Sequence, residues 1–500
     1  MREMDSYVIE DLGIPGATLM ENAAGHIAAA VLELLPPGSP AAVFCGTGNN
    51  GGDGIGAAAR LMESGVRVRV FLIGDVEKLT FDSKVMLRRL EGLGGALERF
   101  VPSGEIENYI NGCGAIIDAM FGTGLNTDLR GDALSAVRAI NAARARVVAA
   151  DIPSGVHADT GAILGNAVRA DVTVTFSMAK PGHFIEPGCT RCGKVRVRDI
   201  GIPGDIVSNA VSHVFAVMPG DLTLPRRRPD THKGDYGRCL IIAGSVGYTG
   251  APAMCARAAS RMGAGLVSLG VPEPIYDTMA IKLDEEMPFP LPADGHGRLA
   301  ANAASEILRR AGGSDVCVIG PGLGKSPEIS ELVQSVIRIS DTPIILDADG
   351  LNAIAENPDI LNQATCPLIL TPHPGEFKRL GGDLSSGDRL RAARVFAQEY
   401  GCVLILKGHR TITALPDGNA YINTTGGPAM AKGGSGDVLA GMIAALTGQN
   451  FPINDAVLTA VYLHGLAGDL CAEEFGEYSV TAGDITAMLP RAVKMSTRQD

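Results

Sequence analysis

The chain has 500 residues, enough for two or three domains, and 46% of them are apolar, so each domain can bury a substantial core. Its formal net charge of −12 excludes a general nucleic-acid-binding protein, which needs a basic surface to neutralise phosphates. No apolar run reaches the length of a membrane-spanning helix, and ten scattered cysteines are typical of reduced thiols in the cytoplasm, where we expect the protein to reside.

Six short apolar runs in the first half predict β-strands. Their almost continuous hydrophobicity is typical of parallel strands that are covered on both faces. Helical spacing at 53–64 and 133–143 predicts helices between them, and this alternation indicates a doubly wound α/β sheet. The predicted strands are Ala41–Cys45, Arg67–Ile73, Ala115–Ala119, Arg146–Ala150, Val172–Phe176 and Lys194–Asp199.

Residues 217–233 interrupt this pattern with Pro219, Pro225, Pro229 and three successive arginines. Such a composition predicts a linker between domains, with the boundary near residues 215–230. We therefore expect one domain over residues 1–215 and a second over residues 225–500.

The second half repeats the alternation of strands and helices without a visible repeat of sequence. A hairpin is expected at 411–423, after the last predicted parallel strand. The predicted strands are Cys239–Gly244, Leu266–Val271, Val316–Ile319, Pro343–Leu346, Leu368–Leu370 and Val403–Leu406. The predicted helices are Ala251–Met262, Glu328–Ile339, Gly387–Glu399, Asp437–Leu446 and Ile453–Phe475.

A glycine-rich turn, Gly46–Gly54, joins the first predicted strand to a helix. Such a turn lets backbone N–H groups approach a phosphate, but a plain tight turn explains it equally well. Asp118 and Asp151 end two further predicted strands, and ligands of doubly wound sheets bind beyond the strands' carboxyl ends. We expect Asn50 and Ser154 to converge with them there. Two carboxylates in one crevice repel each other unless a proton or a cation separates them, and a cation held by oxygen ligands is one solution.

Four segments of the first half, 19–24, 49–53, 118–124 and 151–154, resemble the N-terminal NAD(P)H-hydrate epimerase domain of the YjeF family, over about residues 1–215. The resemblance implies a Rossmann-like three-layer αβα fold and a potassium ion held by Asn50, Asp118 and Ser154. Asp151 becomes the candidate for proton transfer at ring carbon 6, or else only positions the substrate. The residues implied to line the hydrated nucleotide are Asn49, Asn50, Gly51, Gly52, Asp53, Gly122, Thr123, Gly124, Leu125, Asn126, Thr127, Asp128 and Asp151.

The segment Ala431–Gly441 places three glycines and a serine directly before a predicted helix. Its N–H groups can form an anion nest, and Asp437 beside them can take a proton from a hydroxyl that attacks a phosphoryl group. An ordinary helix-start carboxylate is the alternative, but the glycine cluster does not fit a simple cap. The segments 320–324, 371–376 and 407–411 each follow a predicted strand, so we expect them at the same crevice.

These segments, together with 232–237 and 249–252, resemble the ribokinase-like αβα fold and, within it, the ADP-dependent NAD(P)H-hydrate dehydratase domain, over about residues 225–495. The resemblance implies that the ring hydroxyl is phosphorylated and that phosphate then leaves, with Asp437 as catalytic base and Mg²⁺ accompanying ADP. Contacts with the hydrate are implied for Ala251, Gly322, His373 and Asp437. Contacts with the nucleotide are implied for Lys407, Gly408, His409, Arg410, Thr411 and Gly436.

Together the two resemblances imply a bifunctional enzyme. An isomerase would interconvert the R and S epimers of hydrated NADH and NADPH, and a lyase would dehydrate the S epimer and release AMP and phosphate. A kinase that phosphorylates a small alcohol, such as a vitamin precursor, fits the second half nearly as well, but the fused first half disfavours it. A non-enzymatic scaffold would not need the carboxylates Asp118 and Asp151.

We expect small molecules as the only partners, neither nucleic acid nor membrane. A homo-oligomer is also expected, and the apolar helical segment Leu458–Leu466 is a candidate subunit contact. The residues themselves leave the choice between ADP and ATP open.

Overall fold

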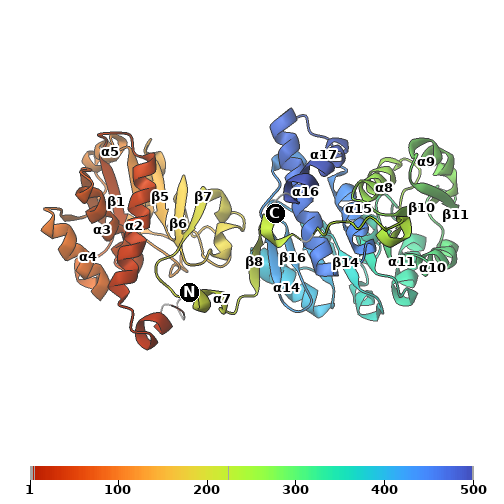
Figure 1. Ribbon diagram of the computed structural model, residues 1–500, viewed down its shortest axis with the longest axis horizontal. Helices are drawn as coiled ribbons and strands as arrows, with labels where there is room; N and C mark the ends of the chain where they lie inside the picture. The colour runs from red at the N-terminus through yellow and green to blue at the C-terminus, as the bar shows by residue number, and fades with distance from the viewer. Residues whose placement is uncertain (1–3, 5, 223, 498–500) are drawn as a thin grey trace. The chain divides into compact units, whose positions relative to one another are not determined.

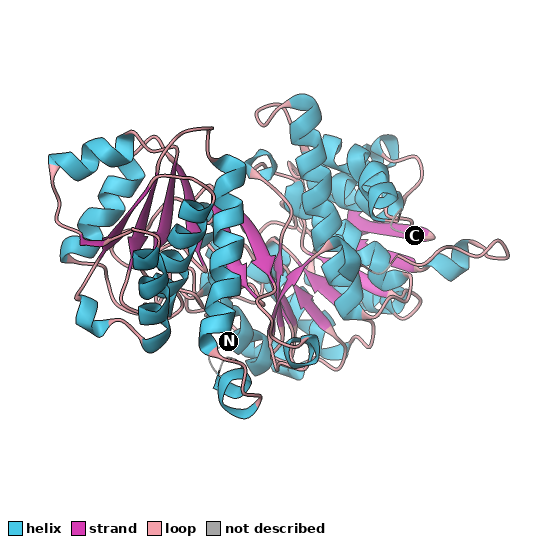
Figure 2. Ribbon diagram, turned by 60° about the vertical axis from the view of Figure 1, so that its left-hand side comes forward, coloured by secondary structure: helices cyan, strands magenta, loops and turns pink. Residues whose placement is uncertain are grey.

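The computed structural model describes residue 4, residues 6–222 and residues 224–497. The chain divides into two compact units, Met1–Ser212 and His213–Asp500. Each unit is an open sheet flanked by helices (Figure 1, Figure 2). Within the described residues, no helix combines the length and the apolar character that crossing a membrane requires.

The sheet of the first unit has seven parallel strands in the order β3-β2-β1-β4-β5-β6-β7. This is the Rossmann order extended by one strand, and its switch point lies between β1 and β4. All six predicted strands are present, whereas β3 is short and too polar to be found from hydrophobicity. The strands are β1 (Ala41–Cys45), β2 (Val68–Leu72), β3 (Leu97–Arg99), β4 (Ala115–Ala119), β5 (Arg146–Ala150), β6 (Val172–Phe176) and β7 (Lys194–Arg198).

Alternate residues of each strand enter two separate cores, because successive side chains of a strand point to opposite faces. Ala41 and Val43 pack with α2, α3 and α4 on one face. Ala42 and Phe44 pack with α5 and α6 on the other. This arrangement confirms the three-layer αβα fold. The helices are α2 (Gly16–Leu34), α3 (Asn49–Glu63), α4 (Phe81–Gly92), α5 (Gly104–Asn111), α6 (Gly131–Ala142) and α7 (Gly204–Ser208).

The sheet of the second unit has the order β11-β10-β9-β12-β13-β14-β15-β16-β17-β8. Its first seven strands are parallel and repeat the relative order of the first unit, with a switch point between β9 and β12. The predicted hairpin is β16 and β17, and β8 pairs with β17 at the edge. The strands are β8 (Val214–Val217), β9 (Arg238–Ile242), β10 (Leu266–Pro272), β11 (Met287–Leu291), β12 (Val316–Ile319), β13 (Ile344–Leu346), β14 (Leu368–Leu370), β15 (Val403–Leu406), β16 (Ile412–Ala414) and β17 (Ala420–Asn423).

One face of this sheet shares a core with α8, α15, α16 and α17. The segment Leu458–Leu466 does not offer the expected apolar face to another subunit, because most of it is buried in that core, Leu463 is fully inaccessible, and Leu458 and Leu466 are partly buried against it. The helices of the unit are α8 (Gly250–Arg261), α9 (Tyr276–Lys282), α10 (Ala304–Ala311), α11 (Pro327–Ile339), α12 (Asp349–Asn352), α13 (Pro374–Arg379), α14 (Arg389–Glu399), α15 (Ser435–Gly448), α16 (Ile453–Phe475) and α17 (Ala482–Ser496).

Shorter helical turns connect these elements in both units. They are η1 (Tyr7–Asp11), η2 (Val76–Lys78), η3 (Pro181–His183), η4 (Gly188–Arg191), η5 (Pro219–Asp221), η6 (Lys233–Tyr236), η7 (Glu273–Ile275), η8 (Ala301–Ala303), η9 (Pro358–Gln363) and η10 (Pro428–Met430).

Candidate active sites

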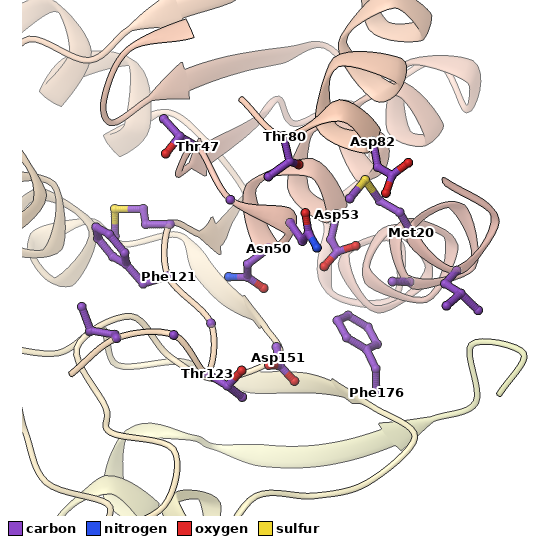
Figure 3. A pocket seen from close by; sticks show the side chains of 18 of the residues that line it. Met20, Thr47, Asn50, Asp53, Thr80, Asp82, Phe121, Thr123, Asp151 and Phe176 are labelled. Atoms are coloured by element: carbon purple, nitrogen blue, oxygen red, sulfur yellow. The ribbon is translucent and has the colours of Figure 1, made fainter. Parts of the chain in front are cut away.

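A cavity of about 680 Å³ opens in the first unit where β1, β4 and β5 end. Figure 3 shows Asn50, Asp53 and Asp151 around this space. The switch point of a doubly wound sheet is where such a ligand site is expected. The predicted residues that line the cavity are Asn49, Asn50, Asp53, Gly122, Thr123, Gly124, Leu125, Asn126, Thr127 and Asp151; Gly51, Gly52 and Asp128 do not line it.

Gly51 and Gly52 instead allow close packing. The predicted helix at 53–64 begins earlier, at Asn49, so both glycines lie in the first turn of α3. A Cβ on Gly51 would approach the carbonyl oxygen of Gly46 to 1.9 Å, and one on Gly52 would lie 2.5 Å from the Met20 sulfur. The Gly51 contact is with backbone and admits only glycine, and it holds the N-terminus of α3 against the end of β1, whereas Gly52 lets α3 approach Met20 of α2.

Asp118 and Ser154 lie buried beside the cavity. Asp118 is completely inaccessible, and burial raises the pKa of its carboxyl to about 6. Ser154 donates to it from its hydroxyl at 2.6 Å and from its backbone N–H at 2.7 Å. Both polar side-chain atoms of Asn50 are also buried and have no hydrogen-bond partner. An unpaired amide oxygen and a buried carboxylate fit a hard cation such as potassium, since such ions prefer oxygen ligands.

Asp151 takes part in a buried polar network. It has a φ of +62°, a strained backbone conformation for a residue with a side chain. Its carboxylate forms an ion pair with Lys180 and accepts a hydrogen bond from the Thr175 hydroxyl at 2.9 Å. Burial alone would raise the pKa of Asp151, but the charge of Lys180 and the hydrogen bonds from Lys180 and Thr175 together outweigh it and hold that pKa below its usual value. Asp151 is therefore a carboxylate at neutral pH.

In the second unit, the glycine-rich segment that is predicted to form an anion nest lies at the start of α15. Gly434 precedes the helix with a φ of +97°, and a Cβ there would lie 2.6 Å from the Met254 sulfur. Asp437 lies in the first turn of this helix. Burial and then the nearby charge of Asp347 raise the pKa of Asp437 to about 7, although Lys407 acts in the opposite direction. A carboxylate with such a pKa is suited to general-base catalysis at neutral pH.

Lys407 lies beside the start of α15 and interacts with two carboxylates. Its Nζ lies 2.7 Å from Asp347 Oδ1 and 4.0 Å from Glu376 Oε2. Thr371 donates to the same Asp347 oxygen at 2.6 Å. A Cβ added to Gly436 would lie 3.3 Å from Lys407 Nζ, so the lysine directly faces the nest. The ends of β13, β14 and β15 thus bring one cation and two carboxylates to the first turn of α15.

The remaining predicted residues lie around this centre. Gly322 has a φ of +67°, and a Cβ there would lie 3.3 Å from the Ala251 side chain, so these two are neighbours. His373 caps α13 by accepting the N–H of Gly375 at 2.9 Å and stays half-exposed. Arg410 donates to the carbonyl of Thr424. The rest of 408–411 forms the turn between β15 and β16, in which Thr411 donates to the Gly408 carbonyl at 3.0 Å.

The sequence analysis missed several functional candidates. Asp347 follows a predicted strand directly, so the rule that found Asp151 would also have found it. Lys180 directly precedes η3 and His183 ends it, both after β6, and only the folded chain brings them to Asp151. His464, inside α16, is buried with one ring nitrogen unpaired.

Two Rossmann-ordered sheets, each with charged side chains beyond the carboxyl ends of its strands, define a two-domain α/β protein of the class that binds nucleotides. The family model described as "YjeF-related protein N-terminus" matches residues 16–182, and the model described as "NAD(P)H-hydrate dehydratase" matches residues 239–491. The chain is 39% identical to a protein of Moorella thermoacetica named bifunctional NAD(P)H-hydrate repair enzyme Nnr, over 99% of this chain and 95% of that one.

A protein of the same name from Thermofilum pendens is also 39% identical, again over 99% of this chain and 95% of the relative. A crystal structure of a ribokinase-like superfamily protein from Enterococcus faecalis matches with a TM-score of 0.51 at 27% identity, over 57% of this chain and 98% of that one. The chain belongs to the family of bifunctional NAD(P)H-hydrate repair enzymes. The expected family and the expected α/β architecture are thereby confirmed.

Proposed function

We propose that this chain repairs hydrated NADH and NADPH, epimerising the hydrate in the first unit and dehydrating its S epimer in the second. The observation that carries the proposal is the presence, in one chain of this family, of two separately equipped crevices. The first crevice has the Asn50 amide, which is buried without a hydrogen-bond partner, and buried carboxylates at or beside a cavity of about 680 Å³. The other has an anion nest with Asp437 and Lys407 beside it.

In the first unit, we assign Asn50, Asp118 and Ser154 to a potassium ion. The ion supplies a positive charge next to the substrate, and the chain's own residues supply orientation and proton transfer. Asn49–Asp53 and Gly122–Asp128 hold the nucleotide, in most cases as walls of the cavity. Asp151, a carboxylate at neutral pH, accepts the proton of the ring hydroxyl when carbon 6 opens.

In the second unit, Asp437 takes the proton of the ring hydroxyl as that oxygen attacks the terminal phosphoryl group of the nucleotide. The nest before α15 and the Lys407 ammonium stabilise the charge of the transferred group. Ala251, Gly322 and His373 hold the hydrate, and Lys407–Thr411 with Gly436 hold the nucleotide. The donor in this proposal is ADP with Mg²⁺, which neutralises phosphate charge. Phosphate then leaves as the ring double bond re-forms.

We further propose that the protein works in the cytoplasm as a homo-oligomer. All ten cysteines are free thiols, and nine of them are buried, which suits a reducing compartment. Light scattering after size-exclusion chromatography measures the number of subunits. A single-subunit mass would contradict the oligomer.

The decisive experiment follows the absorbance of the reduced nicotinamide in a mixture of both NADH-hydrate epimers, with ADP, with ATP or without nucleotide. Full recovery of NADH with ADP supports both activities and the donor. Recovery that stops at the S-epimer fraction means that the first unit is silent. No recovery, with nucleotide consumed on vitamin-like alcohols instead, would favour the kinase.

A further inference from the structure

Lys180 is the only Lys or Arg among the described residues that line the cavity of the first unit, where Asp53, Asp82 and Asp151 supply three carboxylates. Its side chain is only 7% exposed. Burying a lysine costs free energy, and an ion pair often returns less than apolar packing would. A buried lysine in this cavity wall therefore indicates a function that an apolar side chain could not perform.

The Lys180 ammonium is held by groups that fix its position. It forms an ion pair with Asp151 Oδ1 and donates to the Thr175 hydroxyl at 2.7 Å, and that hydroxyl donates to the same carboxylate oxygen at 2.9 Å. The three side chains close a small ring of contacts at the ends of β5 and β6. Asp151 and Lys180 both line the cavity, so a ligand in it can reach the pair.

His183 ties the backbones of the two partners together. Its Nδ1 accepts the backbone N–H of Lys180 at 3.0 Å, and its Nε2 lies 2.8 Å from the carbonyl oxygen of Asp151. Burial and then the Lys180 charge lower the pKa of His183 to about 4, so the ring is neutral. With Nδ1 as acceptor, the proton sits on Nε2 and is donated to Asp151. The ring thereby supports the strained φ of that residue.

We propose that Lys180 is the catalytic acid that works with Asp151 in epimerisation, and that His183 is the positioning residue for both. This inference rests on the proposed function of the first unit. The Asp151 carboxylate removes the proton of the carbon 6 hydroxyl, the carbonyl forms, and the carbon 6–nitrogen bond breaks. Its electron pair goes to the ring nitrogen, which takes a proton from the Lys180 ammonium. Rotation of the aldehyde and the reverse steps close the ring on the other face.

The proton count balances within the pair. One proton enters Asp151 and one leaves Lys180 on opening, and both return on closure, so no outside reactant is needed. A lone carboxylate would leave the departing nitrogen without an acid. The contact between Lys180 and Asp151 also lets the two exchange a proton directly between turnovers.

The test compares Lys180→Arg and Lys180→Met with the wild-type chain, starting from the separated R epimer and following the S epimer by chromatography. Arginine keeps the positive charge but does not give up a proton in proteins. We expect kcat of epimerisation to fall at least about 100-fold in both variants, with KM changed less than about threefold. Lys180→Arg with near wild-type kcat would overturn the assignment, because charge alone would then suffice.

Three controls separate the outcomes. Dehydration of the S epimer, a reaction of the other unit, stays at the wild-type rate if the chain is intact. Thr175→Val removes a partner but neither ionic group, and kcat should fall less than about tenfold. A wild-type chain without epimerisation defeats the proposed function rather than this inference. If both Lys180 variants lose the folded first unit, Lys180 is structural and the inference fails.

His183 is tested by rescue. His183→Phe removes both ring contacts and should lower kcat with little change in KM. His183→Gln, whose amide can still donate to the Asp151 carbonyl, should recover part of that loss. Equal rates in the two variants would show that the ring only fills space.

Discussion

The Asp118 carboxylate accepts two hydrogen bonds from Ser154, one from its hydroxyl at 2.6 Å and one from its backbone N–H at 2.7 Å. Asp118 ends β4 and Ser154 follows β5, so the contact ties two neighbouring strand ends together. The backbone N–H of Met120 donates to the same carboxylate at 3.3 Å, but these three donors do not neutralise a fully buried charge, and the raised pKa of Asp118 reflects that. A cation beside the unpaired Asn50 amide would complete the compensation.

Asp118→Asn should therefore remove the response of epimerisation to potassium. The substitution keeps the size of the side chain but deletes the charge that an ion would balance. We expect the rate to rise with KCl in the wild type and to stay flat, at least about tenfold lower, in the variant. Asp132→Asn, at an exposed position in the first turn of α6 and outside the cavity lining, is the matched control and should keep the wild-type response. An unchanged potassium curve in Asp118→Asn would remove Asp118 as a ligand.

Asp437→Asn should abolish dehydration and leave epimerisation intact. The amide cannot accept the hydroxyl proton, and loss of a general base typically costs a factor of about 100 to 10,000 in rate. The two units have separate sheets and cores, so the first should not sense the change. Both reactions can be followed in one preparation. Loss of both activities would contradict two independent sites.

Asp347→Asn should shift the pH dependence of dehydration toward acid. Asp437 acts as a base only when ionised, so the rate rises as pH increases through its pKa of about 7. The charge of Asp347 contributes to raising that pKa, so its removal lowers the pKa and moves the acidic limb of the kcat profile to lower pH. The variant also frees Lys407 from its ion pair, which acts in the same direction. A limb that stays in place would mean that another group titrates there.

The central strands of both sheets could be predicted from the sequence, because buried parallel strands consist of almost continuous apolar residues. Runs such as Ala41–Cys45 and Val316–Ile319 keep those bounds in the structure. The sequence analysis missed β3, β8 and β11, because a strand at the edge of a sheet is less buried and tolerates polar or exposed residues such as Glu98, Phe215 and Met287. Hydrophobic periodicity does not report such strands.

The candidate sites were predictable only in part. Strand ends identified Asp118 and Asp151, since a carboxylate directly after an apolar run is visible in the sequence. The same rule does not find Lys180, because it does not follow an apolar run directly. It reaches Asp151 through a turn that His183 holds by hydrogen bonds to the backbones of both residues. Gly51 was predicted to contact the substrate, but it packs against the carbonyl oxygen of Gly46 instead. The spacing of residues in the sequence does not reveal how close these two backbone atoms come in the fold.

His464 provides a prediction about stability. It lies buried in α16 with Nε2 unpaired, and burial lowers its pKa from 6.5 to about 4. Between these two values the unfolded chain binds more protons than the folded one, so the free energy of unfolding falls as pH falls. The His464 contribution to this loss is about 2 kcal/mol between pH 7 and pH 5, taking the two pKa values together.

His464→Phe removes the titrating group and keeps an aromatic ring in the helix. Its unfolding free energy should therefore depend less on pH than that of the wild type over this interval, whatever the substitution does to stability at pH 7. Urea denaturation of both chains at pH 7 and pH 5 measures the two differences. The transition of the second unit can be followed through loss of dehydratase activity. Equal losses in the two chains would mean that His464 is already protonated, or partnered by water, in the folded protein.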